Sequence, residues 1–179
     1  MKIRELTKIS MCVALLCISA YISIPLPFTP AMITCLTIVV NLSGLIMSPK
    51  KSFLTLLIYI LLGAIGVPVF VGGAAGLGKI FGPTGGFIFG YLIAAPIISI
   101  LKGNNNNFIR YILVTALVGA PIIYVCGTIS MVLVQNVSIM QALFMSVFPF
   151  IVGDLIKCIV ASFIAIKLNK TLNNEVVNA

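Results

Sequence analysis

Two oppositely charged residues, Asp154 and Lys157, stand three positions apart inside the long apolar run 140–166. On a helix, this spacing puts both side chains on one face, where they can pair. We expect the run to cross a membrane with both residues near its middle, where a charge costs about 2.5–3.5 kcal/mol. Charged residues at that depth normally face a cavity and mark the path of a substrate or ion. A self-compensating ion pair is the alternative, but two apolar residues would replace such a pair at little cost.

The side chains that most enzymes need are missing from this sequence. It contains no histidine, and Asp154 is its only aspartate, which excludes a Ser-His dyad and a pair of catalytic aspartates. A Ser-Lys dyad is formally open but has no motif to support it; it would join Lys157 to Ser130, Ser146 or Ser162. The five cysteines lie singly in apolar runs without a C-x-x-C pair. We therefore predict a binding protein and not an enzyme, with no metal and no cofactor.

The segment 63–90 holds ten of the fifteen glycines in the chain. Gly73 to Lys79 match G-x-x-x-x-G-K, the core of a phosphate-binding loop, but Ile80 stands where the serine or threonine that holds magnesium is required. We therefore exclude nucleotide binding. Irregular backbone at membrane depth is tolerated where it lines a cavity. Because this segment carries only one charge, we predict a re-entrant lid over a small-molecule pocket and not an ordinary outer loop.

The composition indicates which elements must position these residues. Of 179 residues, 61% are hydrophobic and 8% are charged, whereas a soluble domain has about 25% charged residues. The mean hydropathy is +1.25. We predict one integral membrane domain over 1–179, an all-α bundle of six transmembrane helices whose first helix is not a cleaved signal peptide. The predicted spans are about 9–24, 31–47, 52–66, 83–101, 109–134 and 140–166.

The basic residues predict how this bundle is oriented. The net charge is +8, but lysines and arginines are scattered at the ends of apolar runs, so we do not expect nucleic-acid binding. Nine of them fall on one side of the predicted bundle, and Lys79 alone falls on the other. The nine are Lys2, Arg4, Lys8, Lys50, Lys51, Lys102, Arg110, Lys167 and Lys170. Since Lys and Arg accumulate in cytoplasmic loops, both termini are predicted to be cytoplasmic in a multi-pass protein of the cell membrane, surrounded by membrane lipid.

Four segments follow one another along essentially the whole chain. They are Ile22-Ser-Ile-Pro-Leu-Pro-Phe-Thr-Pro30, Gly63-Ala-Ile-Gly-Val-Pro-Val-Phe70, Gly82-Pro-Thr-Gly-Gly-Phe87 and Pro149-Phe-Ile-Val-Gly-Asp-Leu-Ile-Lys157. Together they resemble the BioY family, the biotin-specific substrate-binding (S) components of energy-coupling factor (ECF) transporters. The resemblance implies high-affinity biotin uptake across the bacterial cytoplasmic membrane, with a pocket that faces outward beneath the loop between the third and fourth helices. It also implies a membrane scaffold (T) subunit and two cytoplasmic ATPases as partners.

The resemblance places Asp154 and Lys157 in the substrate site. As a hypothesis, Asp154 accepts hydrogen bonds from the ureido N–H groups of biotin, and Lys157 donates to the ureido oxygen. Lys79, or backbone N–H groups of the lid such as that of Gly73, would meet the biotin carboxylate. Three aromatic residues would pack on the ring and chain of biotin: Phe70, Phe87 and Tyr91. The reverse orientation of biotin stays open.

The sequence departs from the family pattern at two places. Members often carry A-x-x-x-A on the first helix, where the scaffold subunit docks; here the nearest pair of small residues is Ser10 and Ala14, and we expect docking there. Members often carry a glutamine in the second helix where this chain has Cys35, so a polar contact from that position is lost. An S component for a different vitamin, a homodimer, and action with or without the ATPases all stay open.

Overall fold

Helices make up most of this computed structural model, which describes residues 3–103 and 105–177. The mostly helical fold confirms the predicted helical class. Of the basic residues used to predict the orientation, Lys2 lies outside the described residues. The α-helices are α1 (Ile3–Tyr21), α2 (Leu36–Ile46), α3 (Pro49–Ala64), α4 (Leu77–Ile80), α5 (Gly85–Leu101), α6 (Phe108–Val114), α7 (Ala120–Gln135), α8 (Ile139–Ser146) and α9 (Ile151–Val177). A 3-10 turn, η1 (Val71–Gly73), and a π-helical turn, η2 (Thr115–Gly119), complete the helical elements.

A small β-hairpin corrects the predicted all-α fold. Strands β1 (Ser23–Pro25) and β2 (Met32–Thr34) pair antiparallel between α1 and α2, so the predicted helices 9–24 and 31–47 each lose residues to it. The physical reason is the proline spacing at Pro25, Pro27 and Pro30. Proline lacks the N–H that a helix needs, and it also holds the residue before it in extended conformations.

The predicted sixth span is a broken helix, which corrects the single helix expected over 140–166. Helices α8 and α9 meet at 47°, and Pro149 lies in the break between them. A capping box of Ser138 and Gln141 starts α8. Asp154 consequently lies in the first turn of α9, where the positive end of the helix dipole favours a carboxylate. The two charged residues therefore sit near a helix start, just after the break in the α8–α9 pair.

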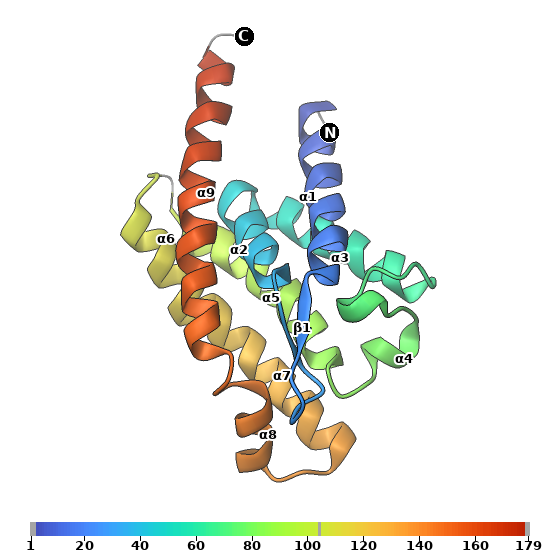
Figure 1. Cartoon of the computed structure of the whole chain (residues 1–179). Coiled ribbons are helices and arrows are strands. Elements are labelled where there is room, and N and C mark those ends of the chain that lie inside the picture. The colour runs from blue at the N-terminus through green and yellow to red at the C-terminus, as the bar shows by residue number, and fades with distance from the viewer. Residues whose placement is uncertain (1–2, 104, 178–179) are drawn as a thin grey trace.

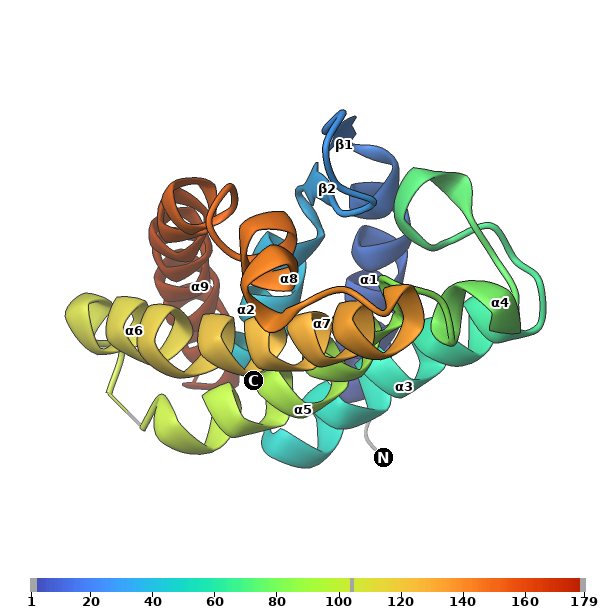
Figure 2. The ribbon, with the colours of Figure 1, turned by 90° about the horizontal axis from the view of Figure 1, so that it is seen from below.

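The interior is formed around α2 and the α5–α7 pair. Eight of the eleven residues of α2 are buried, and this helix packs against both α5 and α9. Figure 2 shows α6 and α7 in one row with α5 beside them. The close contact of α5 with α7 depends on Gly86, because a Cβ atom there would lie 2.0 Å from the carbonyl oxygen of Cys126. Small residues at such positions let helix backbones approach closely.

The helices are arranged so that α1 begins and α9 ends at the same end of the molecule, while β1, α4 and α8 lie toward the other end (Figure 1). Among the described residues, the continuous helix 108–135 is long and apolar enough to cross a membrane. The bent pair of α8 and α9 would make a second. Helices α2 and α5 are apolar but shorter, with 11 and 17 residues, where a span needs about 20.

Candidate ligand-binding site

One cavity collects most of the side chains that the sequence singled out. It encloses about 670 Å³ of space free of protein atoms, its opening to solvent included. Of the seven predicted substrate-binding residues, six line it: Phe70, Lys79, Phe87, Tyr91, Asp154 and Lys157. The hairpin, the α3–α5 connection, α5, α7 and the start of α9 all contribute to its wall. Residues far apart in the sequence therefore form a single site.

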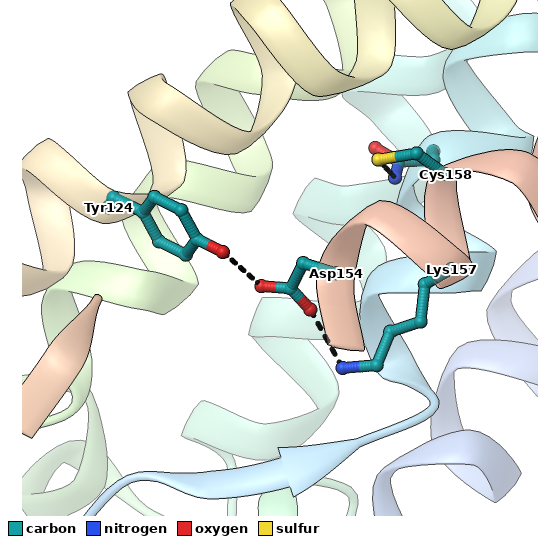
Figure 3. Close-up of polar contacts among 5 residues, drawn as sticks. Tyr124, Asp154, Lys157 and Cys158 are labelled. Atoms are coloured by element: carbon teal, nitrogen blue, oxygen red, sulfur yellow. Dashed lines mark hydrogen bonds and ion pairs between the residues drawn. The ribbon is translucent and has the colours of Figure 1, made fainter. Parts of the chain in front are cut away.

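The charged pair forms the polar end of this cavity. Lys157 Nζ lies 2.8 Å from Asp154 Oδ1, and both side chains are nearly buried. The hydroxyl of Tyr124 donates to the other carboxylate oxygen, Asp154 Oδ2, at 2.7 Å (Figure 3). A carboxylate has about four sites that accept hydrogen bonds, so Asp154 keeps acceptor capacity for a ligand. Lys157 likewise has two further N–H donors.

Lys79 is a second cationic group on the cavity wall, contributed by α4 from the glycine-rich connection. Its side chain is partly buried, and burial lowers the pKa of its ammonium group. Among the described residues, no carboxylate forms an ion pair with it. Burial disfavours the charged form of this ammonium group, and a nearby anionic group of a ligand would stabilise that form.

Aromatic side chains form the apolar wall. Phe70 is 1% exposed, and its ring packs edge-on against Tyr59 with 5.7 Å between the ring centroids. The Tyr59 hydroxyl donates to the carbonyl oxygen of Val69 at 3.0 Å, which fixes the chain next to Phe70. Phe87 packs over Gly127 of α7, where a Cβ atom would lie 2.5 Å from the ring. These contacts hold the rings in place before a ligand arrives.

Gly73, which we predicted to meet the substrate through its backbone N–H group, does not line the cavity. It lies in η1 with φ +73°, a left-handed conformation that suits glycine, and its nearest side chain is that of Tyr21. The Tyr21 hydroxyl donates to the carbonyl oxygen of Pro68 in the same connection. The glycine shapes the turn, and residues on either side of it reach the cavity, Phe70 and Lys79 among them.

Several lining residues were missed by the sequence reasoning, Tyr59, Thr37 and Tyr124 among them. Each stands alone in an apolar run, and no charge marks the face of the helix that it occupies. A hydroxyl-bearing residue inside a predicted membrane helix is a weak signal for a polar site, and it could have drawn attention to Tyr124.

The remaining predicted positions lie elsewhere. Ser10 and Ala14 are exposed on α1, and the Ser10 hydroxyl donates to the carbonyl oxygen of Leu6 in its own helix. Cys35 precedes α2 and does not line the cavity. The serines considered as nucleophiles do not line it either: Ser130, Ser146 and Ser162. The arrangement around Lys157 is therefore suited to binding and not to a Ser-Lys dyad.

The sequence matches the family model of the BioY family over residues 1–174. It is 39% identical over 168 residues to the "Probable biotin transporter BioY" of Pyrococcus horikoshii, which covers 94% of this chain and 98% of that protein. It is 36% identical over 167 residues to the "Biotin transporter BioY" of Thermotoga maritima, with 93% and 96% covered.

Two solved structures have a similar fold. A crystal structure of the S-component for biotin from an ECF-type ABC transporter superposes with a TM-score of 0.84 and 26% identity, covering 94% of this chain and 92% of that one. The structure of an S component of a bacterial ECF transporter superposes with a TM-score of 0.60 and 17% identity, with 97% of each chain covered, and shows the fold alone.

Proposed function

The chain belongs to the BioY family, and on that premise we propose that it takes up biotin as the substrate-binding S component of an ECF-type ABC transporter. It is a transport protein and not an enzyme. The observation that carries the proposal is the cavity in which the Asp154–Lys157 pair faces an aromatic wall. A ligand that is polar at both ends and apolar between them fits this lining, and biotin has that distribution.

The proposed biotin pose matches each part of the ligand with lining residues of suitable chemistry. The ureido ring lies at the polar end, with its N–H groups donating to Asp154 and its oxygen accepting from Lys157. The thiophane ring and valeryl chain pack on Phe70, Phe87 and Tyr91. The carboxylate lies beside Lys79, the cationic group that has no carboxylate partner among the described residues.

The protein is an integral membrane protein, and we propose that its helices form six spans of one domain in the bacterial cytoplasmic membrane. Helices α6 and α7 would form one span and the bent α8–α9 pair another. The shorter helices would complete the bundle, since neighbouring helices can satisfy their ends. The start of α1 and the end of α9 lie at the same end of the molecule (Figure 1), which supports two termini on one side, and the basic residues indicate that this side is cytoplasmic. The hairpin and the glycine-rich connection then cover a cavity that faces outward.

The proposed partners are the ECF module, a scaffold subunit with two ATPases. The exposed face of α1 around Ser10 and Ala14 is the proposed docking surface, because small residues allow close helix contact. A homodimer is the alternative assembly. Cross-linking from a cysteine introduced at Ala14 to the scaffold subunit, or to a second copy, separates the two.

Equilibrium binding of radiolabelled biotin to the purified chain in detergent tests the proposed function. We expect saturable binding, displaced by unlabelled biotin and not by a hundredfold excess of other vitamins. Displacement by another vitamin at lower concentration would favour the alternative, an S component for that vitamin. Monodisperse protein that binds no biotin would overturn the proposal.

Lys79→Met tests the proposed position of the carboxylate. We expect about a tenfold weaker affinity for biotin, because one partly exposed charge-assisted contact of about 1.4 kcal/mol is lost. Biotin methyl ester has no carboxylate charge, so its affinity should be the same for the wild type and the variant. Equal losses for both ligands, or a loss for neither, would favour the reverse orientation, with the carboxylate beside Lys157.

Tyr124→Phe tests the contact that sequence reasoning missed. Removing the hydroxyl deletes the hydrogen bond to Asp154 Oδ2, and we expect biotin affinity to fall roughly tenfold, as for a hydrogen bond to a charged group. Tyr111→Phe is the matched control, since its buried hydroxyl bonds to Asn106 outside the cavity. Equilibrium binding of both variants should show a loss in the first alone, and an equal loss in both would contradict a specific role of Tyr124.

A further inference from the structure

A second, smaller hollow lies next to the polar end of the cavity, between α2, α7 and α9. We call it the inner compartment, and the residues that matter in it are Thr37, Asn41, Tyr124, Asp154 and Cys158. Three of these, Thr37, Tyr124 and Asp154, also line the main cavity. The inner compartment therefore continues the binding site past the Asp154 carboxylate, toward Asn41 and Cys158.

Two buried oxygen atoms of the inner compartment have no hydrogen-bond partner among the described residues: Asn41 Oδ1 and Thr37 Oγ1. Asn41 is 3% exposed, and its Nδ2 group donates weakly to Cys158 Sγ at 3.6 Å. Figure 3 places Cys158 on the same helix as Asp154 and Lys157. A buried polar atom without a partner is unfavourable, since it loses its hydration and gains nothing in return. These two atoms thus point to a polar occupant.

The backbone around the inner compartment departs from regular α-helix at the same place. The π-helical turn η2 spans Thr115–Gly119, and the next residue, Ala120, lines the compartment. Such single π turns are frequent at functional sites. A Cβ atom on Gly119 would lie 3.5 Å from Asn41 Oδ1 and 2.7 Å from the Ile98 side chain. Glycine there lets the widened turn lie close to the Asn41 amide.

We propose that the inner compartment binds one internal water molecule and that Asn41, through this water, is a positioning residue for Asp154. The water donates to Asn41 Oδ1 and to the Asp154 carboxylate, and it accepts from the Thr37 hydroxyl. Three hydrogen bonds are the usual number for a buried water, and a hollow of at least about 10–15 Å³ is needed to hold one. The space open to water here is about 10 Å³, which is room for a single molecule.

Water fits this donor and acceptor set better than a metal ion does. Calcium takes six to eight oxygen ligands and magnesium six in near-octahedral geometry, whereas the inner compartment offers the oxygens of Thr37, Asn41, Tyr124 and Asp154. Tyr124 already donates its proton to Asp154. A water instead needs one donor and two acceptors, and the compartment provides these.

Infrared spectroscopy of the biotin-free protein tests the water directly, because Asp154 is the only aspartate in the chain. Aspartate labelled with ¹³C at its side-chain carboxylate, supplied during cell-free synthesis, gives one shifted carboxylate band that belongs to Asp154. We would record this band for the wild type, Asn41→Leu, Thr37→Val and Ser162→Ala. Ser162 is the matched control, since it is fully buried on α9 with an unpartnered hydroxyl but lies outside the inner compartment.

We expect the Asp154 band to move in Asn41→Leu and in Thr37→Val, because each variant removes one partner of the water, and to stay in place in Ser162→Ala. Biotin affinity should fall about tenfold in Asn41→Leu, the factor for one hydrogen bond, and should not change in Ser162→Ala. An unmoved band in Thr37→Val and in folded Asn41→Leu overturns the proposal, as does an equal shift in Ser162→Ala. If Asn41→Leu does not fold, Thr37→Val decides.

The affinity measurement alone rests on the proposed function. If the wild type binds no biotin, the proposed function fails, but the infrared bands still decide whether the water is present. A weaker affinity of Asn41→Leu with an unmoved Asp154 band would assign Asn41 a role in packing only, which overturns its positioning role.

Discussion

Asp154→Asn is expected to weaken biotin binding at least a hundredfold. The variant keeps the size of the side chain but removes the negative charge that pairs with Lys157 at 2.8 Å. A ureido N–H then loses its charged acceptor, a hydrogen bond worth about 1.5–3 kcal/mol, and Lys157 loses the counter-ion that holds it in place. A change of about 2.7 kcal/mol is already a factor of a hundred in affinity. Equilibrium binding of labelled biotin in detergent measures the effect.

Glu5→Gln is the matched control for this variant. Glu5 also pairs with a lysine, Lys51, but both side chains are about a third exposed and lie outside the cavity. Surface ion pairs contribute about 0–1 kcal/mol, so biotin affinity should be unchanged. Binding by Asp154→Asn within threefold of the wild type would contradict the proposed role of the charge, and an equal loss in Glu5→Gln would show that the assay reports general damage.

A double variant separates the role of the charge in binding from its role in stability. Asp154→Asn and Lys157→Met each leave one buried partner unpaired, whereas the two together remove both charges. Replacing a whole buried ion pair is often neutral for stability, while breaking it is destabilising. We therefore expect the double variant to be more thermally stable than either single variant and still to bind biotin no better.

The charged part of the site could be predicted from the sequence because a charge in an apolar run is unfavourable unless it has a use. Asp154 and Lys157 stood out on that ground alone, and Lys79 was the one charge in the glycine-rich segment. Tyr124 could not be found in the same way. Its hydroxyl reaches Asp154 only because α7 turns the Tyr124 side chain toward the first turn of α9, and the apolar pattern of a fully hydrophobic helix does not indicate that rotation.

The errors in the predicted fold have a common cause in proline and glycine. Hydropathy follows the apolar run 140–166 through Pro149, and it extends the first two predicted spans up to Pro25 and Pro30, although the backbone leaves the helix near each of these prolines. Glycine permits several backbone conformations, so the glycines of segment 63–90 predicted an irregular connection without indicating which turn faces the cavity. Phe70 and Lys79 line the cavity and Gly73 does not, and the sequence alone could not make that distinction.

Gly86→Ala is expected to cause the largest loss of stability of any single methyl group added to the α5–α7 contact. The new Cβ atom would lie 2.0 Å from the carbonyl oxygen of Cys126 and 2.6 Å from the Ser130 side chain. Because the first of these atoms belongs to the backbone, the two helices must move apart. Overpacking of this kind costs roughly 3 kcal/mol, which corresponds to a melting temperature lower by roughly 6–12 °C for a chain of this size.

Gly153→Ala makes the same chemical change near the start of another helix, where a Cβ atom would meet nothing within 4 Å. Alanine favours a helix by about 1 kcal/mol over glycine, so this control should melt at the same temperature as the wild type or slightly higher. Both variants are compared by thermal unfolding in the same detergent.

Since Phe87 and Tyr91 belong to α5 and Tyr124 to α7, moving these helices apart widens the cavity, and biotin should bind to folded Gly86→Ala less tightly. Equal melting temperatures for the two variants would show that α5 and α7 can separate at no cost, and the close helix contact would then have no part in holding the aromatic wall together.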